Sequence, residues 1–390
     1  MLDVLIIGGG PVGLLNALLL ARCGLTVEVI DQEEGIVSSP RAMTYQWTIF
    51  ERLASIGILE DMLEAGITET ERSWRVFETG ETVIYNYETI RDLTPYPFSL
   101  SLGQDGVAKI LLDHLSRYPN AAVRWRTRFR SLRQDFDQVV AMVDTPSGPE
   151  TLQARWMIAA DGGRSAVRKA LALPFDGMTF PDRFVVTNIH YDFDNFGWRS
   201  GYLVDAKFGA VVAKINGDGL WRVTFSEDAA LPLETIERRI VAFINTILPG
   251  QKRFDLVLHT AYSMHQRSAD RYRVGRVLLA GDAAHVTNPT AGMGLMGGMF
   301  DAFALSEALI LVHTEASDDR VIDQYAKARR AVFLNFSSPI SVESKRLVFH
   351  STDKERLRRD LDALKARQAD PMAMREYLLR SKALETRIHA

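Results

Sequence analysis

The feature that most constrains the fold is a glycine-rich turn between a strand and a helix at the start of the chain. Residues 2–7 (LDVLII) form a short apolar run, typical of a strand buried on both faces of a parallel sheet. Three glycines in G-x-G-x-x-G spacing follow, which permit a tight turn, close approach of a pyrophosphate and tight helix–strand packing. A nucleotide site is therefore expected at Gly8, Gly10, Pro11, Val12 and Gly13.

The next two elements strengthen this motif. A helix is predicted from Pro11 to about Cys23, ended by Gly24, and its free amides and positive dipole end would face the phosphates. The strand LTVEVID then ends at Asp31, eighteen residues after Gly13, where a carboxylate can accept hydrogen bonds from a ribose. Strand, turn, helix and acid together indicate a dinucleotide, but they leave NAD and FAD as alternatives.

Two later strand ends favour FAD. Residues 154–171 (ARWMIAADGGRSAVRKAL) predict a strand leading to Asp161, although an ordinary turn with Ser165 as helix cap and solvated arginines has the same pattern. Residues 277–305 (VLLAGDAAHVTNPTAGMGLMGGMFDAFAL) predict an apolar strand, Gly281 and Asp282, a Pro/Gly-rich bend and an apolar helix. A charge at such a strand end needs a partner, and ribityl hydroxyls would satisfy Asp282. The opening turn and this acid should therefore lie close together.

These three segments, in this order, resemble the fingerprints of the group A flavoprotein monooxygenases, the family of p-hydroxybenzoate hydroxylase and phenol hydroxylase. The similarity extends from residue 2 to about residue 310, and the stretch YRVGRVLLAGDAAH is especially similar to the phenol hydroxylase branch. The resemblance implies bound FAD, dioxygen as co-substrate and transfer of oxygen through a flavin C4a-hydroperoxide. NADPH or NADH would be a transient reductant, because no second G-x-G-x-x-G with its strand and helix occurs.

The resemblance also implies roles for single residues. Arg41 would lie near the FAD pyrophosphate, and Gln104 would open a helix and hydrogen-bond FAD, unless it is only an exposed helix-start residue. Pro289 would hold the bend beside the reactive edge of the flavin. Tyr202 is the candidate for a hydrogen bond to the substrate, with the alternatives His190, Tyr191 and Arg199.

One segment departs from the family pattern. Relatives have G-G-Q-G-x-N after the proline, whereas this chain has AGMGLMGG, with Met296 where asparagine is common. The backbone amides of Gly294, Leu295 and Met296 remain available to the pyrimidine edge of the flavin, so flavin binding is still expected. The methionines here are expected to be packing residues.

The scattered fingerprints predict an α/β fold in which a three-layer, Rossmann-type FAD-binding domain is discontinuous. Alternating runs such as WRVFETGETVIYNY and YLVDAKFGAVVAKI predict an inserted, mostly antiparallel sheet, which by resemblance roofs the substrate cavity. Leu357, Leu361 and Leu364 predict a helix that packs on the flavin domain or on a second subunit of a homodimer. The expected boundaries are 1–70, 101–178 and 265–320 for the FAD domain, 71–100 and 179–264 for the sheet, and 321–390 for C-terminal helices.

Composition narrows the function classes. A net charge of −3 disfavours a nucleic-acid partner, so the alternating arginines from Arg124 to Arg130 predict a strand with one solvated face rather than a basic groove. The single cysteine, Cys23, is expected in the core of a protein from a reducing, cytoplasmic compartment. No secretory leader and no membrane span are expected. No metal site is expected either, and His285 should anchor its loop through hydrogen bonds.

The sequence therefore predicts an NAD(P)H-dependent FAD monooxygenase that hydroxylates a small phenolic or N-heteroaromatic compound. A Baeyer–Villiger enzyme, another FAD oxidoreductase and a non-catalytic flavin-binding sensor remain alternatives. A halogenase is disfavoured because its W-x-W-x-I arrangement is missing, and a membrane isoprenoid enzyme should have a more apolar tail. The substrate and the choice between NADH and NADPH stay open.

Overall fold

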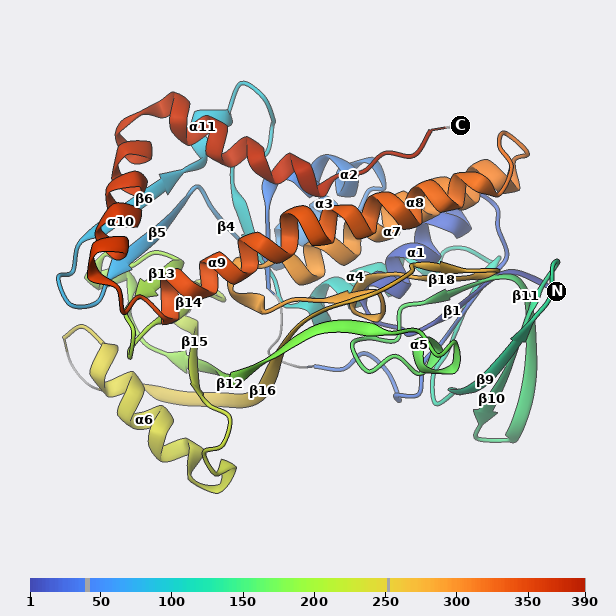
Figure 1. Cartoon of the computed structure of the whole chain (residues 1–390), viewed down its shortest axis with the longest axis horizontal. Coiled ribbons are helices and arrows are strands. Elements are labelled where there is room, and N and C mark those ends of the chain that lie inside the picture. Colours follow the sequence, from blue (N-terminus) through green and yellow to red (C-terminus); the bar gives the residue numbers. More distant parts are fainter. Residues whose placement is uncertain (39–42, 251–252, 390) are drawn as a thin grey trace.

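The computed structural model describes residues 1–38, 43–250 and 253–389 and contains two eight-stranded sheets with helices packed around them. Figure 1 shows the first sheet on the right, the second on the left, and the helices of the C-terminal third above both. The predicted α/β class, with a parallel sheet, a mostly antiparallel sheet and C-terminal helices, is confirmed.

The first sheet has a parallel core in the order β18-β11-β1-β2-β8, with β17 at one edge. Helix α1 joins β1 to β2, because the connection between parallel neighbours must cross from one end of the sheet to the other. The elements are β1 (Leu2–Ile7), α1 (Pro11–Arg22), β2 (Val27–Ile30), β8 (Ala121–Arg124), β11 (Gly148–Ala159), α5 (Ala166–Ala170), β17 (Arg273–Val274) and β18 (Val277–Leu279).

The arginine-rich segment is not one strand. Strand β8 ends at Arg124, and β9 (Arg128–Gln134) starts a separate antiparallel pairing with β10 (Val139–Thr145), which in turn pairs with β11. Between them the backbone turns at Arg126, whose φ is 55°. The amides of Arg126 and Thr127 donate to the carbonyls of Glu33 and Asp31, at 2.7 and 2.8 Å, and these bonds to a distant loop interrupt the pattern.

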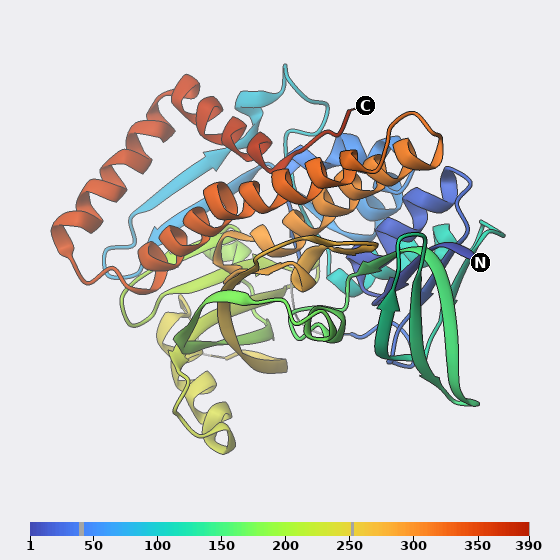
Figure 2. The same cartoon turned by 45° about the vertical axis from the view of Figure 1, so that its right-hand side comes forward.

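The second sheet has the order β19-β16-β12-β15-β14-β13-β5-β6, and within it β13 and β5 are the parallel pair. Figure 1 shows the long strands β12 and β16 of this sheet below the C-terminal helices, and in Figure 2 helix α6 (yellow) lies below this sheet, away from the β9–β10 hairpin on the right. The elements are β5 (Glu71–Val76), β6 (Thr82–Asn86), β12 (Phe175–His190), β13 (Gly201–Val204), β14 (Ala210–Lys214), β15 (Leu220–Asp228), α6 (Ile236–Ile247), β16 (Asp255–Ala269) and β19 (His285–Val286).

Smaller elements connect the two sheets. Between β2 and β8 the chain forms a three-stranded sheet and three helices in addition to β5 and β6, and helix α4 packs against α1. These elements are β3 (Thr44–Tyr45), α2 (Phe50–Ser55), α3 (Leu59–Ala65), β4 (Ile67–Glu69), β7 (Ser99–Ser101) and α4 (Gln104–Leu115).

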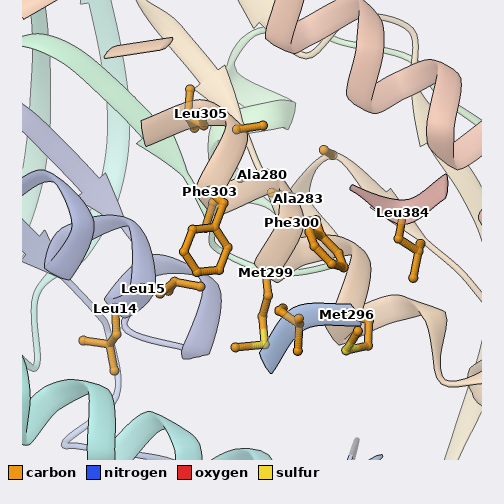
Figure 3. Packing of buried hydrophobic residues seen from close by; sticks show 14 of the residues in the cluster. Leu14, Leu15, Ala280, Ala283, Met296, Met299, Phe300, Phe303, Leu305 and Leu384 are labelled. Atoms are coloured by element: carbon orange, nitrogen blue, oxygen red, sulfur yellow. The ribbon is translucent and has the colours of Figure 1, made fainter. Parts of the chain in front are cut away.

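The long helix α7 (Met293–His313) forms the centre of the core. Figure 3 shows its side chains Met299 and Phe303 packed near Leu14 and Leu15 of α1. Among the described residues, α7 alone is long and apolar enough to cross a membrane, but 72% of that apolar window is buried inside the protein. Its composition is therefore explained by its place in the core.

The chain after residue 320 is helical, as predicted. Helix α8 (Arg320–Val332) continues through a π-helical turn (Phe333–Ser337) into α9 (Ser338–Phe349), followed by α10 (Lys354–Ala369) and α11 (Pro371–Leu379). Helix α10 buries Leu361 and Leu364 and packs on edge strand β6, where Gln368 Oε1 accepts a hydrogen bond of 2.9 Å from the amide of Ile84. It thus covers the second sheet rather than the flavin domain.

Cys23 is exposed, so its predicted place in the core is wrong. It follows the last residue of α1, and Gly24, with a φ of 90°, turns the chain at the surface before β2.

Candidate active site

The predicted cofactor segments meet at one edge of the parallel sheet. The glycine turn follows β1, Asp31 follows β2, Asp161 follows β11, and Gly281 lies two residues after β18. These four strands are parallel neighbours, so their carboxyl ends lie side by side. Ligands of open α/β sheets bind at this edge.

The three glycines of the opening turn have different steric surroundings. A Cβ built on Gly8 would lie 2.3 Å from the carbonyl oxygen of Ala160, and one on Gly13 would lie 1.9 Å from the carbonyl oxygen of Gly8. Both positions therefore exclude a side chain because backbone packs against them. A Cβ on Gly10 would meet nothing within 4 Å. Open space above Gly10 fits the close approach of a pyrophosphate.

Asp31 holds the opening turn. Its Oδ2 accepts a hydrogen bond of 2.6 Å from the amide of Gly9, and its Oδ1 accepts one of 2.8 Å from the amide of Glu33. Each carboxylate oxygen can accept a second bond. A contact with a ribose stays a prediction.

The opening turn touches the Gly281 segment directly. A Cγ carbon of Val12 lies 3.1 Å from a Cβ built on Gly281 and 2.7 Å from one built on Gly298 of α7. Segments some 270 residues apart thus form one surface, as FAD stretched between them requires.

Asp282 lies in the turn Gly281–Ala283, directly after the strand end, with its side chain exposed. The buried acid is Asp301 of α7, a residue that the sequence analysis missed. Its Oδ2 accepts hydrogen bonds from the amide of Gly281 at 3.0 Å and from Nε2 of His285 at 2.7 Å. His285 therefore anchors its loop, as predicted. The ribityl role of Asp282 stays a prediction.

Arg168 joins the second and third cofactor segments. Its guanidinium donates hydrogen bonds of 2.8 Å to the carbonyls of Ala283 and Gly163 and lies 3.6 Å from the centroid of the Phe175 ring. The residue is 4% exposed, so the alternative of solvated arginines does not apply to it. Sequence reasoning missed this role because the partner carbonyl is 115 residues away.

Asp161 caps helix α5. Its Oδ2 accepts hydrogen bonds from the amides of Ala166 and Val167, at 2.7 and 3.1 Å, and Ser165 Oγ accepts one from the amide of Arg168 at 2.9 Å. Burial raises the pKa of Asp161, although hydrogen bonds from Ser165 and from the amides of Val167 and Ala166 oppose the rise. The carboxylate has a clear local role, and its contact with a cofactor stays a prediction.

Helix α7 presents its amino end to the site. The helix starts at Met293, and the first four amides of a helix have no partner within it. The predicted amides of Gly294, Leu295 and Met296 are among these four. The Met296 side chain is fully buried, and Figure 3 shows it among the packed core residues.

The bend before α7 is held by side chains. Pro289 begins a 3-10 turn that ends at Ala291, and Gln266 Oε1 accepts hydrogen bonds of 3.1 Å from both the backbone and the side-chain nitrogen of Asn288. The hydroxyl of Tyr202 donates a 2.9 Å hydrogen bond to the carbonyl of Thr290. Tyr202 thus lies beside the proline bend.

The Tyr202 ring also packs against Trp74, with 4.2 Å between ring centroids, and burial raises the pKa of Tyr202 well above its usual value. The three alternatives are placed differently. His190 is exposed, Tyr191 donates to the carbonyl of Pro249, and Arg199 pairs with Glu71 at 2.6 Å. Tyr202 is the member of the four that contacts the bend.

Two further predictions concern the segments that lead into the site. Gln104 is the first residue of α4 and is half-buried, as its predicted place at a helix start requires, and its contact with FAD stays a prediction. Arg41 lies outside the described residues, so its role also stays a prediction.

Comparison with known proteins decides the family. A family model described as an FAD binding domain matches residues 1–336. The chain is 38% identical over 385 residues to the 6-hydroxy-3-succinoylpyridine 3-monooxygenase of Pseudomonas putida, covering 98% of both chains. The chain belongs to the FAD-dependent aromatic monooxygenases. A second monooxygenase of this family, the para-nitrophenol 4-monooxygenase of a Pseudomonas species, is 38% identical over 391 residues, covering 98% of this chain and 96% of the relative.

Solved structures of monooxygenases agree. The crystal structure of p-nitrophenol 4-monooxygenase from Pseudomonas putida superimposes with a TM-score of 0.96 at 36% identity, covering 100% of this chain and 99% of that one. Aklavinone-11 hydroxylase in a ternary complex with FAD and aklavinone gives a TM-score of 0.80 at 27% identity, covering 90% and 70%. FAD is therefore the cofactor of this monooxygenase, and the open space over Gly10 and the amino end of α7 fit it.

Proposed function

We propose that this monooxygenase hydroxylates a small aromatic ring that already carries a hydroxyl group, either a phenol or a hydroxylated N-heterocycle, with NADH or NADPH as transient reductant. The observation that carries the proposal is similarity over almost the whole length to two monooxygenases, one named for para-nitrophenol and one for 6-hydroxy-3-succinoylpyridine. Both named compounds are hydroxylated rings with an electron-withdrawing substituent.

FAD would extend along the carboxyl edge of the parallel sheet. Its adenosine and pyrophosphate would lie on the opening turn, its ribityl chain beside Asp282, and its flavin ring against the amides that start α7. Bound FAD supplies electron transfer from NAD(P)H and oxygen transfer to the ring. The residues proposed to hold it are Gly8, Gly10, Pro11, Val12, Gly13, Asp31, Arg41, Gln104, Asp161, Gly281, Asp282, Gly294, Leu295 and Met296.

The substrate would lie between the bend at Pro289 and the second sheet, whose residue Tyr202 already contacts Thr290. Two buried polar atoms here, Nε1 of Trp74 and Oγ1 of Thr290, have no hydrogen-bond partner within the described part of the chain. Buried polar groups are normally paired. Polar substituents of a bound aromatic would pair with them, and Tyr202 would orient the ring hydroxyl.

The direct test is a screen of the purified holoenzyme with phenols, hydroxypyridines and aromatic acids. Substrate-stimulated NADH or NADPH oxidation, coupled to oxygen uptake and to a product with a new hydroxyl group on the aromatic ring, would support the proposal. An ester or lactone product, with oxygen inserted beside a carbonyl, would instead indicate Baeyer–Villiger chemistry. FAD binding without stimulated oxidation by any compound would indicate a flavin-binding sensor.

Trp74→Phe gives a sharper test of the substrate site, because it removes the indole N–H and keeps an aromatic ring against Tyr202. A higher KM with unchanged FAD occupancy is expected.

We also propose a cytoplasmic location and a homodimer, and light scattering of the purified holoenzyme tests the dimer.

A further inference from the structure

A buried ionic cluster lies behind the flavin site. Oδ1 of Asp301 accepts a hydrogen bond of 2.7 Å from Nε of Arg329. Its Oδ2 accepts hydrogen bonds from Nε2 of His285 and from the amide of Gly281. The side chains of Asp301, Arg329 and His285 are 0%, 1% and 3% exposed. A buried charge is tolerated only when it keeps its charged partner and its hydrogen bonds. The cluster therefore fixes the positions of the backbone groups that it contacts.

Arg329 extends the cluster in two directions. Its Nη2 donates to the carbonyl of Gly297 in α7 at 3.1 Å, close to the amides proposed to face the flavin ring. Its Nη1 donates to the carbonyl of Leu384 at 2.5 Å and to Oγ1 of Thr386 at 3.2 Å. One guanidinium therefore joins the start of α7 to a segment near residue 385.

Segment 384–388 is seated firmly on α7. The amide of Ile388 donates to Glu307 Oε2 at 2.9 Å, and Arg52 pairs with both Glu307 and Glu385, at 2.5 and 2.9 Å. Leu384 and Ile388 are buried, and Figure 3 shows Leu384 on the side of α7 where Phe300 packs.

His285 completes the cluster on the other side. Its ring stacks against Tyr272 and Phe333, with centroid distances of 5.9 and 4.7 Å, and Phe333 begins the π-helical turn between α8 and α9. Burial would raise the pKa of Asp301, but the neighbouring His285 and Arg329 outweigh burial and lower this pKa to about 2. The carboxylate is therefore ionised throughout the neutral range.

We propose that Asp301, Arg329 and His285 are positioning residues for FAD. Together with segment 384–388 they form a clamp that fixes the turn at Gly281 and the start of α7. The cluster holds the Gly281 amide and the Gly297 carbonyl at fixed places, and these two groups border the turn of Asp282 and the first turn of α7. Flavin affinity and the flavin environment therefore depend on residues that do not touch the cofactor. This proposal rests on the flavin site of the proposed function but not on its substrate.

The test uses Arg329→Lys, which keeps the charge and loses the fork of donors. The matched control is Arg183→Lys in the second sheet, because Arg183 is also a buried arginine paired with a carboxylate, Glu227, at 2.7 Å. For each variant, FAD is titrated into apoprotein, the visible absorption and fluorescence of bound flavin are recorded, and thermal unfolding of the apoprotein is followed.

Arg329→Lys should raise the Kd for FAD at least about tenfold, the effect of one weakened charged hydrogen bond, and shift the flavin bands. Arg183→Lys should lower the thermal stability and leave the Kd for FAD and the flavin bands unchanged. Thr386→Val, which removes one acceptor of Arg329 and keeps the shape, should change Kd in the same direction by a smaller factor.

Two outcomes would overturn the proposal. If Arg329→Lys loses stability but keeps the wild-type Kd and flavin spectrum, the cluster only supports the fold. If Thr386→Val binds FAD like wild type while Arg329→Lys does not, segment 384–388 is outside the clamp. A wild-type protein that binds FAD but oxidises no substrate would contradict the proposed function alone.

Discussion

Gly10→Ala separates the requirements of folding from those of FAD binding. Gly10 has ordinary backbone angles, with φ of −78° and ψ of 177°, and a Cβ there would meet no protein atom within 4 Å. Alanine should therefore leave the free energy of unfolding of the apoprotein within about 0.5 kcal/mol of wild type, as for an unconstrained surface position. The same methyl group would occupy the space through which the pyrophosphate approaches the turn.

The magnitude follows from the contact that is lost. A hydrogen bond from the turn to a charged phosphate contributes about 1.5–3 kcal/mol, so its loss should raise the Kd for FAD by about tenfold to 150-fold. Titration of FAD into apoprotein, followed by flavin fluorescence, measures the Kd, and urea unfolding of the apoprotein measures stability.

Two control variants separate a folding defect from a binding defect. Gly13→Ala places a Cβ 1.9 Å from the carbonyl oxygen of Gly8 and should damage the packing of α1 on β1. This variant should therefore have both a lower free energy of unfolding and a weaker affinity for FAD. Gly217→Ala, in a distant turn with open space around the Cβ, should keep the stability and the FAD affinity of wild type. A Gly10→Ala protein that binds FAD within about twofold of wild type would refute the placement of the pyrophosphate over this turn.

Three further predictions concern the rest of the site and the fold. Asp282→Ala should give folded but flavin-poor protein by visible absorbance, and full flavin occupancy would remove the ribityl assignment. Tyr202→Phe should cost about 1 kcal/mol of stability through loss of the bond to Thr290 and should slow substrate-dependent NAD(P)H oxidation at unchanged FAD occupancy; an unchanged rate would contradict the substrate role. Burial and then Lys345 lower the pKa of His350 from 6.5, so the unfolded chain takes up this proton more readily and stability should fall as pH drops below about 6.5. His350→Gln should flatten the melting temperature between about pH 7 and 5.5, and equal pH slopes in both proteins would disprove the linkage.

The elements that local patterns encode were predictable. An apolar run, G-x-G-x-x-G and an acid at the next strand end specify strand, turn, helix and strand without reference to the rest of the chain. The same holds for the strand pairs around Gly80 and Gly217, and for the charged helix of Leu361 and Leu364, because alternation and helical spacing are short-range signals.

The site was predictable only where a motif marks it. An acid in the middle of the apolar run GGMFDAFAL was a signal for Asp301, since an unpaired buried carboxylate is costly. Its partner Arg329 had no comparable signal, because the pairing depends on how α8 crosses α7. The same is true of Arg168, whose partner is a backbone carbonyl and carries no residue identity.

The sequence by itself determined the order of the strands and turns that hold FAD, because each is set by neighbours a few residues away. Tertiary structure decided which polar groups are buried and where strands stop. Cys23 is exposed because the chain turns at the surface between α1 and β2. The arginine strand breaks at Arg126 because the amides of Arg126 and Thr127 donate to the carbonyls of Glu33 and Asp31. Burial and long-range hydrogen bonding exist only once segments distant in sequence are packed together, so no local pattern encodes them.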